Sequence, residues 1–260
     1  MPSHFSCTMC GRCCRDLRLP LSLAEAADWL RDGGETQLLC DAIPWPVEPA
    51  ADDRLAAYKS RRSFPAMSGT LPLRVIVTVV AAFEGPCPHL QADLRCGAYD
   101  RRPRVCRIYP AEINPFIELQ PAAKLCPPEA WDERHPVLEV EGRYANASLV
   151  ATIDAFRAAD IHDVEAKRRL CDVLGVRTAA VANEGFVVIA PGREAMANAI
   201  AAAMRDDEVA SDAASAASWT FISNRRGTRE TLVSVDAKAG APEALPALHE
   251  YLGFQAANGD

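Results

Sequence analysis

The chain has 260 residues, of which 49% are hydrophobic and 24% are charged. This is the composition of an ordinary globular protein, and it excludes a disordered, collagen-like or coiled-coil chain. A chain of this length buries roughly three quarters of its surface on folding. Its ten cysteines are therefore not needed as the disulfide staples of a mini-protein.

Charge and hydropathy narrow the class of protein further. The most apolar run, residues 75–83, is far shorter than the roughly 20 residues that cross a bilayer. The first 18 residues lack the apolar region and cleavage site of a signal peptide, so we expect a cytoplasmic protein without a membrane partner. The net charge of −7 arises in residues 131–260, and such an acidic half does not suit a nucleic-acid binder.

The predicted elements of the N-terminal half begin with a helix. Ser22 and Glu25 form its capping box, and Gly33-Gly34 ends it. Residues 40–50 contain three prolines and are predicted to be a loop, followed by a short helix at 52–60. Residues 73–83, rich in Val and Ile, are predicted to form a buried strand. Residues 86–128 are rich in proline, and we expect little regular structure there.

The C-terminal half shows helical and strand patterns in turn. Helices are predicted at 148–158, at 160–174 with Gly175 as the stop, at 194–205 and at 242–252. Strands are predicted at 181–190, 219–223 and 230–236, with a polar stretch at 206–218. We therefore expect an α+β fold. It would have an irregular cysteine-rich metal-binding core with helices and a few strands in residues 1–175, and a small α+β subdomain or extension in residues 176–260.

Eight of the ten cysteines fall in two short windows. Thiolates two residues apart, as in the first window, can bend back onto one metal centre, the geometry of zinc knuckles and iron–sulfur loops. Adjacent residues tend to point in different directions, so Cys13 and Cys14 serve either different centres or two sides of one cluster. The first window reads Cys7-Thr8-Met9-Cys10-Gly11-Arg12-Cys13-Cys14.

The second window contains Cys87, Cys96, Cys106 and Cys126. Its wide spacings cannot form a compact binding loop unaided, so we expect these cysteines to converge with those of the first window. Thiols stay reduced in the cytoplasm, which favours a metal or redox role over disulfides. Cys40 and Cys171 stand apart beside leucines and are predicted to be core residues.

Together these motifs resemble the CxxCxxCC family, also called YkgJ-type cysteine-cluster proteins, a zinc- or iron-chelating domain. The resemblance covers roughly residues 5–130 and implies bound metal, and many members of the family are labelled as iron–sulfur proteins. Flagellin lysine methylases are similar over the same cysteine core, which implies that one branch is catalytic. The matching pieces are the first window, Cys87-Pro88-His89-Leu90, Cys96, Tyr99 through Arg107, Tyr109-Pro110 and Cys126.

The expected cofactor is a 4Fe-4S cluster or zinc, because thiolates alone suit both. Such a centre is anionic, and we expect Arg104 and Arg107 to offset its charge and, with Tyr99, to line a concave pocket beside it. Arg101 and Arg102 are predicted to lie on a solvated face, and His89 to lie outside the ligand set. The predicted metal ligands are Cys7, Cys10, Cys13, Cys14, Cys87, Cys96, Cys106 and Cys126.

Two functions remain open from the sequence. One is a metal-binding protein with a redox or catalytic centre, whose substrate the sequence does not reveal. The other is a structural zinc module that serves as an interaction scaffold without catalysis. The sequence contains no GxGxxG, P-loop, HExxH or GxSxG motif that would point to another chemistry.

Overall fold

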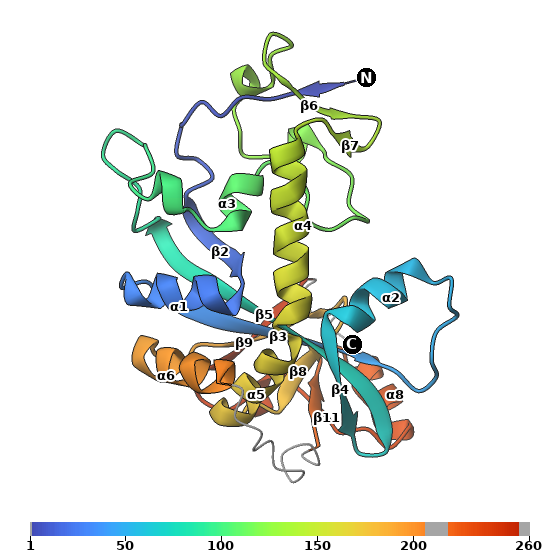
Figure 1. The fold of residues 1–260 in the computed structure, drawn as a ribbon. Helices are drawn as coiled ribbons and strands as arrows, with labels where there is room; N and C mark the ends of the chain where they lie inside the picture. The colour runs from blue at the N-terminus through green and yellow to red at the C-terminus, as the bar shows by residue number, and fades with distance from the viewer. Residues whose placement is uncertain (1, 206–217, 255–260) are drawn as a thin grey trace.

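A large mixed sheet, a small antiparallel sheet and the helices around them make up the α+β fold. A computed structural model describes residues 2–205 and 218–254 of the chain (Figure 1). Within these residues the small sheet has the strand order β1-β6-β7. Its strands are β1 (Ser3–His4), β6 (Val137–Val140) and β7 (Arg143–Tyr144).

The large sheet has the order β11-β10-β8-β3-β5-β2 over the described residues, with β4 paired to β5, and with β9 paired to β3 and β12. The segment after residue 176 supplies β8 to β12, so the predicted division at residue 175 falls within a sheet that both halves of the chain build. The strands are β2 (Arg15–Leu21), β3 (Thr36–Pro44), β4 (Ser63–Ser68), β5 (Leu71–Pro86), β8 (Thr178–Val181), β9 (Gly185–Ile189), β10 (Thr220–Ile222), β11 (Ala239–Gly240) and β12 (His249–Gly253).

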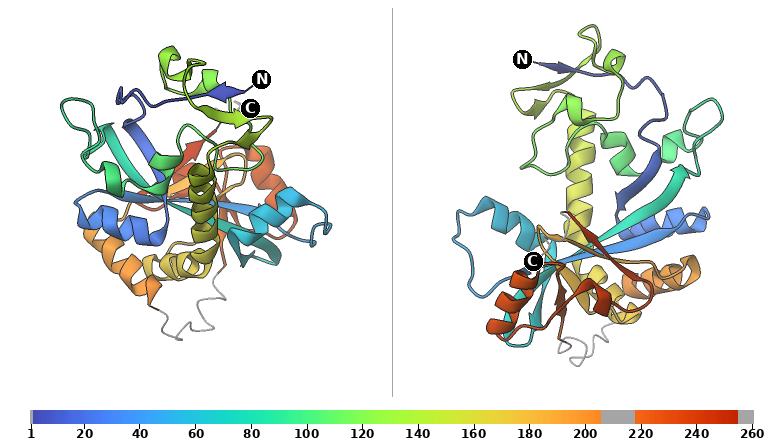
Figure 2. Two further views of the ribbon diagram at one scale, coloured as in Figure 1. Left: turned by 45° about the horizontal axis from the view of Figure 1, so that its top comes forward. Right: turned by 180° about the vertical axis from the view of Figure 1, so that it is seen from behind.

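One long helix, α4, connects the large sheet with the rest of the molecule (Figure 1). Helix α4 rises from the large sheet into a lobe made of the small sheet and residues 86–145 (Figures 1 and 2). The α-helices are α1 (Leu23–Arg31), α2 (Arg54–Arg61), α3 (Arg104–Ile108), α4 (Ala147–His162), α5 (Val164–Leu174), α6 (Arg193–Met204) and α8 (Arg226–Ser234). The 3-10 helices are η1 (Tyr99–Arg101), η2 (Pro121–Ala123), η3 (Pro128–Trp131) and η4 (Pro242–Ala244).

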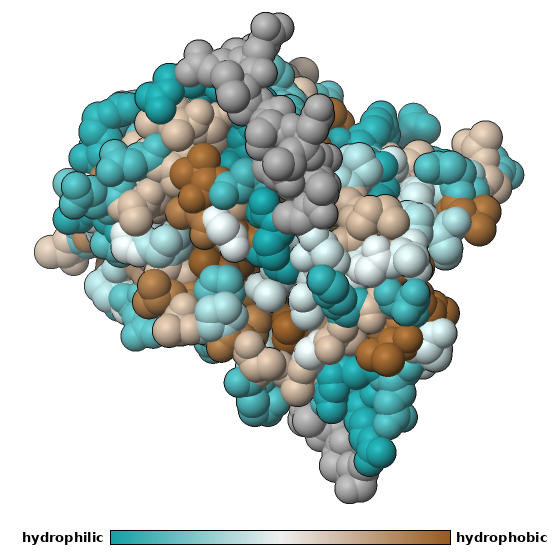
Figure 3. Space-filling view, turned by 90° about the horizontal axis from the view of Figure 1, so that it is seen from below, coloured by the Kyte–Doolittle hydropathy of each residue, from teal (hydrophilic) through white to brown (hydrophobic). Residues whose placement is uncertain are grey.

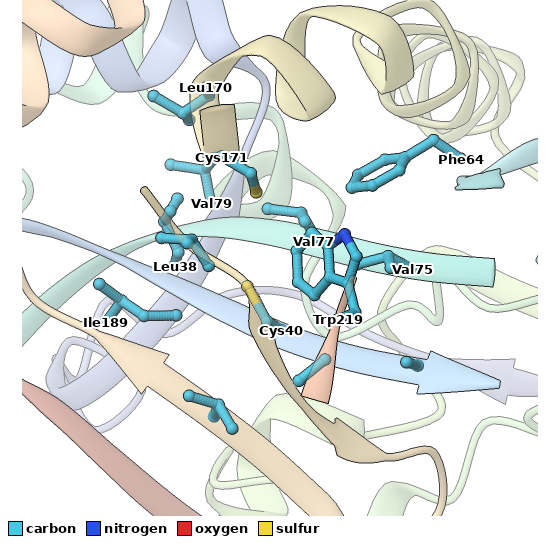
Figure 4. Close-up of a cluster of buried hydrophobic side chains, with 14 of the residues drawn as sticks. Leu38, Cys40, Phe64, Val75, Val77, Val79, Leu170, Cys171, Ile189 and Trp219 are labelled. Carbon is cyan, nitrogen blue, oxygen red and sulfur yellow. The ribbon is translucent and has the colours of Figure 1, made fainter. Parts of the chain in front are cut away.

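The main hydrophobic core lies between the large sheet and helices α1, α5 and α6. Alternate residues of β5, such as Val75, Val77 and Val79, point into it because successive side chains of a strand face opposite sides. Cys40 and Cys171 are both 0% exposed within this core, which confirms their prediction as core residues (Figure 4). Seen from below, apolar side chains lie in separate groups among polar ones (Figure 3).

Local sequence signals predicted several elements correctly. At the start of α1, the Ser22 hydroxyl accepts from the Glu25 N–H at 3.3 Å and the Glu25 carboxylate accepts from the Ser22 N–H at 3.0 Å. The predicted helices near α2, α4, α5 and α6, and the strands at β5 and β10, are also confirmed. The predicted strand at 181–190 is instead divided between β8 and β9, with Asn183 at a positive φ of 71° between them.

Three other predictions are wrong because contacts with residues outside the predicted segment decide its structure. Residues 40–44 belong to β3, whose pairing with β5 continues as far as Pro44. Residues 230–234 lie in α8, where the carboxylate of Glu230 pairs with Arg226 one turn earlier. Residues 242–252 form only the short η4 before β12, which pairs with β9. The predicted polar stretch lies, for residues 206–217, outside the described part of the chain.

Within the described ranges, no helix has both the length and the apolar character needed to cross a membrane.

The Asp41 carboxyl of β3 should make the stability of the fold depend on pH. Burial raises the pKa of its carboxyl to about 7, although nearby Arg62 and Lys59 act to lower it. Because this pKa lies above that of an unfolded Asp, the free energy of unfolding should fall as the pH rises from about 4 to about 7. The loss due to Asp41 should be on the order of 2–4 kcal/mol.

Urea unfolding of the wild type and Asp41→Asn between pH 4 and pH 8 checks this expectation. The variant should lack that part of the pH dependence and should be the more stable protein above pH 7. Parallel stability curves for the two proteins over the whole range would contradict the assignment.

Candidate metal centre

The end of the β2–β5 pair brings four of the cysteines together. Arg15 of β2 pairs with Pro86 of β5, and the Cys87 N–H donates to the Cys14 carbonyl oxygen at 2.8 Å. A β-bridge between Leu90 and Cys96 folds the following loop back onto this point. Helix α3, which carries Cys106, packs against β2. We call the resulting group the inner quartet: Cys14, Cys87, Cys96 and Cys106.

The thiols of the inner quartet lie close enough to act on one another. The pKa of Cys106 is raised to about 12, mainly by burial and in smaller part by the neighbouring thiols of Cys87, Cys14 and Cys96. Cys87 also has a raised pKa, first from burial and then from the nearby thiols of Cys14 and Cys96. The inner quartet therefore joins one cysteine of the first window to three of the second.

A second group forms where the N-terminal segment passes residues 125–131. The Ser6 N–H donates to the Ala130 carbonyl at 2.9 Å, and the rings of Phe5 and Trp131 lie 4.9 Å apart. These contacts place the first window beside Cys126. We call this group the outer quartet: Cys7, Cys10, Cys13 and Cys126.

The outer quartet also interacts through its thiols. Cys126 has a raised pKa, mainly because of burial, and the thiols of Cys10 and Cys7 add to the rise. The thiols of Cys126 and Cys7 also raise the pKa of Cys13. Both quartets thus combine cysteines of the two windows, which confirms that the windows converge.

The two quartets meet at the adjacent pair Cys13 and Cys14. A hydrogen bond between their thiols raises the pKa of Cys13 and lowers that of Cys14 to about 6. Arg102 also lowers the pKa of Cys14 through its positive charge. The thiolate form of Cys14 is therefore the favoured one of this pair near neutral pH.

Backbone amides point at two of the sulfurs. The backbone N–H groups of His89 and Leu90 lie near the Cys87 sulfur and act to lower its pKa, and the Leu90 N–H donates to the Cys87 carbonyl oxygen at 2.8 Å. The Met9 N–H donates to the sulfur of Cys7 at 3.4 Å. Hydrogen bonds of this kind stabilise a thiolate, the form in which cysteine binds metals.

Arg102, rather than Arg104, faces the cysteines. Arg102 lowers the pKa of both Cys14 and Cys106, and its guanidinium lies 3.7 Å from the centroid of the Tyr99 ring. Arg102, predicted to lie on a solvated face, is half-buried and lies close enough to these two cysteines to act on them. Tyr99 is 53% exposed and also accepts a hydrogen bond from Arg102 through its carbonyl oxygen.

Arg104 instead contacts helix α1. Its guanidinium forms an ion pair with the Glu25 carboxylate at 3.0 Å, and its N–H donates to the same carboxylate at 2.8 Å. The sequence predicts that Arg104 lines a pocket beside the cysteines. This prediction is wrong, because its side chain pairs with Glu25 of the α1 capping box. Arg107 is exposed on the last turn of α3. A cavity of about 480 Å³ at the same end of the β2–β5 pair is lined by residues 16–18, 35–37 and 82–84 with Ala190 and Gly192, and by none of the cysteines or arginines named here except Arg18.

Tyr109 has a contact that sequence reasoning missed. Its hydroxyl bonds to the sulfur of Cys126 and accepts from the Leu125 N–H at 2.9 Å. The Lys124 ammonium lies 5.7 Å from the centroid of the Tyr109 ring and acts to lower the pKa of Cys126. In the sequence, Tyr109-Pro110 is one of the pieces that resemble the family, and the fold shows that the Tyr109 hydroxyl reaches a cysteine.

His89 packs against helix α1, and the eight thiols do not converge on one point in the described chain. The His89 ring packs edge-on against Trp29, with 5.2 Å between centroids. In residues 2–205 and 218–254, no three His, Cys, Asp or Glu side chains already enclose a site for one ion. The thiols of each quartet are therefore neighbours that do not yet surround a common point, and Cys7 is the most exposed of the eight.

A lobe with eight neighbouring thiols and cationic groups beside them defines a cysteine-rich, metal-binding class of domain. Residues 6–127 match the family CxxCxxCC, described as "Putative zinc- or iron-chelating domain". The match places the similarity on the same stretch of the chain, roughly residues 5–130, for which the sequence motifs predicted it. No curated protein and no solved structure shows significant similarity to the chain.

Proposed function

We propose that the eight clustered cysteines bind iron as iron–sulfur centres with a redox or catalytic role in the cytoplasm. The observation that carries this proposal is the gathering of eight thiols from both windows into one lobe, partly open to solvent. A structural zinc site needs only four thiolates and is closed by them, so eight partly exposed thiols favour a working centre.

The residues present fit such a centre. Thiolates are the ligands that zinc and iron–sulfur clusters prefer, and backbone N–H and phenol O–H groups are the donors that tune their sulfurs. When bound, an iron–sulfur centre supplies one-electron transfer. The chain itself would hold the sulfurs through Cys-x-x turns, offset their charge with Arg102 and Lys124, and orient Cys126 through Tyr109.

The position of the lobe also supports a working centre. The main core between the sheet and helices α1, α5 and α6 is extensive, and of the eight clustered cysteines only Cys87 packs against it. Because such a core can fold without metal, the thiols are not needed to hold the protein together, and they can take part in a redox or catalytic reaction. The acidic C-terminal half makes nucleic acid an unsuitable partner, and we infer no membrane partner.

A second candidate function is a structural zinc module that presents an interaction surface. The packing of the lobe favours it, because the apolar cluster under α3 is small. Its buried members are Ile108, Ala111, Ile153 and Phe156. A lobe with so little apolar burial would gain stability from metal, as small zinc domains do.

Anaerobic purification, followed by an absorption spectrum and by iron, sulfide and zinc analysis, separates the two candidates. Iron–sulfur centres predict a brown protein with sulfur-to-iron charge-transfer absorption near roughly 400 nm and equal iron and sulfide contents. A colourless protein with stoichiometric zinc would support the scaffold function instead. A protein that takes up neither metal, even after anaerobic reconstitution, would contradict both.

Tyr109→Phe should shift the reduction potential of the bound centre to a more negative value. The substitution removes the O–H group that bonds to the Cys126 sulfur, and hydrogen bonds to sulfur ease reduction of a cluster. Tyr99→Phe is the matched control, since Tyr99 meets Arg102 through its ring and carbonyl. Redox titration followed by absorption measures both variants, and equal potentials for the two would contradict the role of Tyr109.

A further inference from the structure

We propose that the exposed surface beside the cysteines docks an acidic electron-carrier protein, which passes one electron to the metal centre. The inference rests on the proposed function and deepens it, since it names the kind of partner that a redox centre here would take. In the transfer the carrier's own redox group loses one electron and the centre gains it, and no covalent bond forms or breaks. We call this surface the docking face: Met9, Arg12, Arg15, Leu94, Arg95 and Tyr99.

Three exposed arginines of the docking face are direct chain neighbours of cysteines. Within the described residues, the guanidinium groups of Arg12 and Arg15 have no hydrogen-bond or ion-pair partner. Arg95 meets Asp93 at 3.8 Å, but its side chain is 66% exposed, and an ion pair this exposed contributes little. All three guanidinium groups can therefore pair with carboxylates of a partner. The neighbours are Arg12-Cys13, Cys14-Arg15 and Arg95-Cys96.

The charge of this region is opposite to that of the whole chain. Residues 7–18 and 87–107 contain eight arginines and three acidic residues, whereas the net charge of the chain is −7. Two of the arginines pair with carboxylates at the two ends of α1, and the other six still outnumber the three acidic residues. Electrostatic complementarity therefore favours an acidic partner and disfavours a basic one. The two pairs are Arg101–Asp32 and Arg104–Glu25.

Exposed apolar side chains lie among these arginines. Met9 is 46% exposed, Leu94 is 42% exposed, and the Tyr99 side chain is also open to solvent. The loop that carries Leu94 packs on the first window, since a Cβ added to Gly11 would lie 3.5 Å from Leu94. Methionine, aromatic and arginine side chains are enriched at the centres of protein interfaces. This mixture favours a protein as the partner over a nucleic acid.

Backbone contacts bring the two segments of the docking face together. The Cys87 N–H donates to the Cys14 carbonyl oxygen at 2.8 Å, which places Arg15 at the base of the loop 87–97. Both segments lie where the β2–β5 pair ends (Figures 1 and 2). The docking face is far smaller than the roughly 20–30 residues of a standard interface, and small interfaces are typical of transient electron-transfer complexes.

Stopped-flow oxidation of a reduced, acidic plant-type ferredoxin by the metal-loaded protein tests the docking face. The rate should fall at least about tenfold as salt rises from about 0.01 M to about 1 M, because the Debye length shrinks from about 30 Å to about 3 Å. The double variant Arg12→Glu/Arg15→Glu should react at least about tenfold more slowly than the wild type at low salt.

Arg54→Glu is the matched control, because it makes the same charge change at an exposed arginine of α2, outside the lobe (Figure 1). It should react like the wild type. Calorimetric titration with the oxidised ferredoxin measures docking without electron transfer, and only the double variant should lose this binding. If the double variant loses its metal, the wild type is compared with basic cytochrome c as the probe. Tighter binding of the ferredoxin supports the docking face, and tighter binding of cytochrome c overturns it.

The outcomes separate this inference from the proposed function. A protein that holds iron and sulfide, but whose reaction with ferredoxin is independent of salt and unchanged in the double variant, overturns the docking face while the proposed function stands. A protein without a redox-active centre overturns the proposed function, and calorimetric binding of the ferredoxin then decides the docking face. A dimer of the chain, or bound RNA, that the double variant abolishes would give the face another occupant and overturn the inference.

Discussion

Loss of the metal, by chelation or through Cys106→Ser, should make residues 86–128 the first part of the chain that a protease cuts. This segment contains η1, α3 and η2 as its helices, and its prolines cannot join a continuous hydrogen-bonded ladder. Its order should therefore depend on metal. Fragments from limited proteolysis, identified by mass spectrometry, should begin or end within the segment, and cleavage should accelerate at least tenfold.

Helix α5 supplies the internal control for this experiment. It is anchored in the main core by Leu170 and Cys171, both fully buried, and by the ion pair of Lys167 with Asp160 at 2.5 Å. It should survive longer than the segment 86–128, whereas the first half of α4, which packs on α3, should be intermediate. Proteolysis that stays unchanged after verified metal loss would show that the lobe holds itself together.

Gly69→Ala should destabilise the protein by about 3 kcal/mol or more. Gly69 lies in the turn between β4 and β5 with φ at +58°, where an added Cβ would stand 1.8 Å from the carbonyl oxygen of Asp236. That oxygen belongs to the backbone between α8 and β11, and it cannot move without breaking the bond from Lys238 N–H to the Ser68 hydroxyl. The strain of the left-handed backbone and the overlap of the new Cβ with the Asp236 oxygen therefore both destabilise the variant.

Gly175→Ala separates these two contributions. Gly175 has a similar φ of +66° at the end of α5, but an added Cβ would have nothing within 4 Å. Its alanine variant should cost only about 1–2 kcal/mol, the strain of a left-handed residue. Urea unfolding of both variants measures the difference, and equal costs would mean that the turn and the α8–β11 connection do not press on each other.

Features encoded by neighbouring residues were predictable from the sequence. The capping box of Ser22 and Glu25 and the Val-rich run of β5 each depend on short-range chemistry, and both are present. The cysteine spacing also predicted convergence of the two windows, because neither window could form a site alone. The family match over residues 6–127 agrees with those motifs.

Features decided by distant contacts could not be predicted in this way. The partner of Arg104 is Glu25, which lies 79 positions away in the sequence, so spacing near Cys106 favoured the wrong arginine. The division of the cysteines depends on the register that pairs Arg15 with Pro86. Likewise, residues 249–253 form a strand because β9 is available to pair with them, and their own pattern suggested a helix.

X-ray absorption of the anaerobically purified protein at the iron and zinc edges tests the central claim most directly. We expect iron with a first shell of sulfur at about 2.3 Å and a second shell of neighbouring iron, as in a thiolate-bound cluster. Iron bound mainly by oxygen or nitrogen, or a zinc edge with no iron, would contradict it.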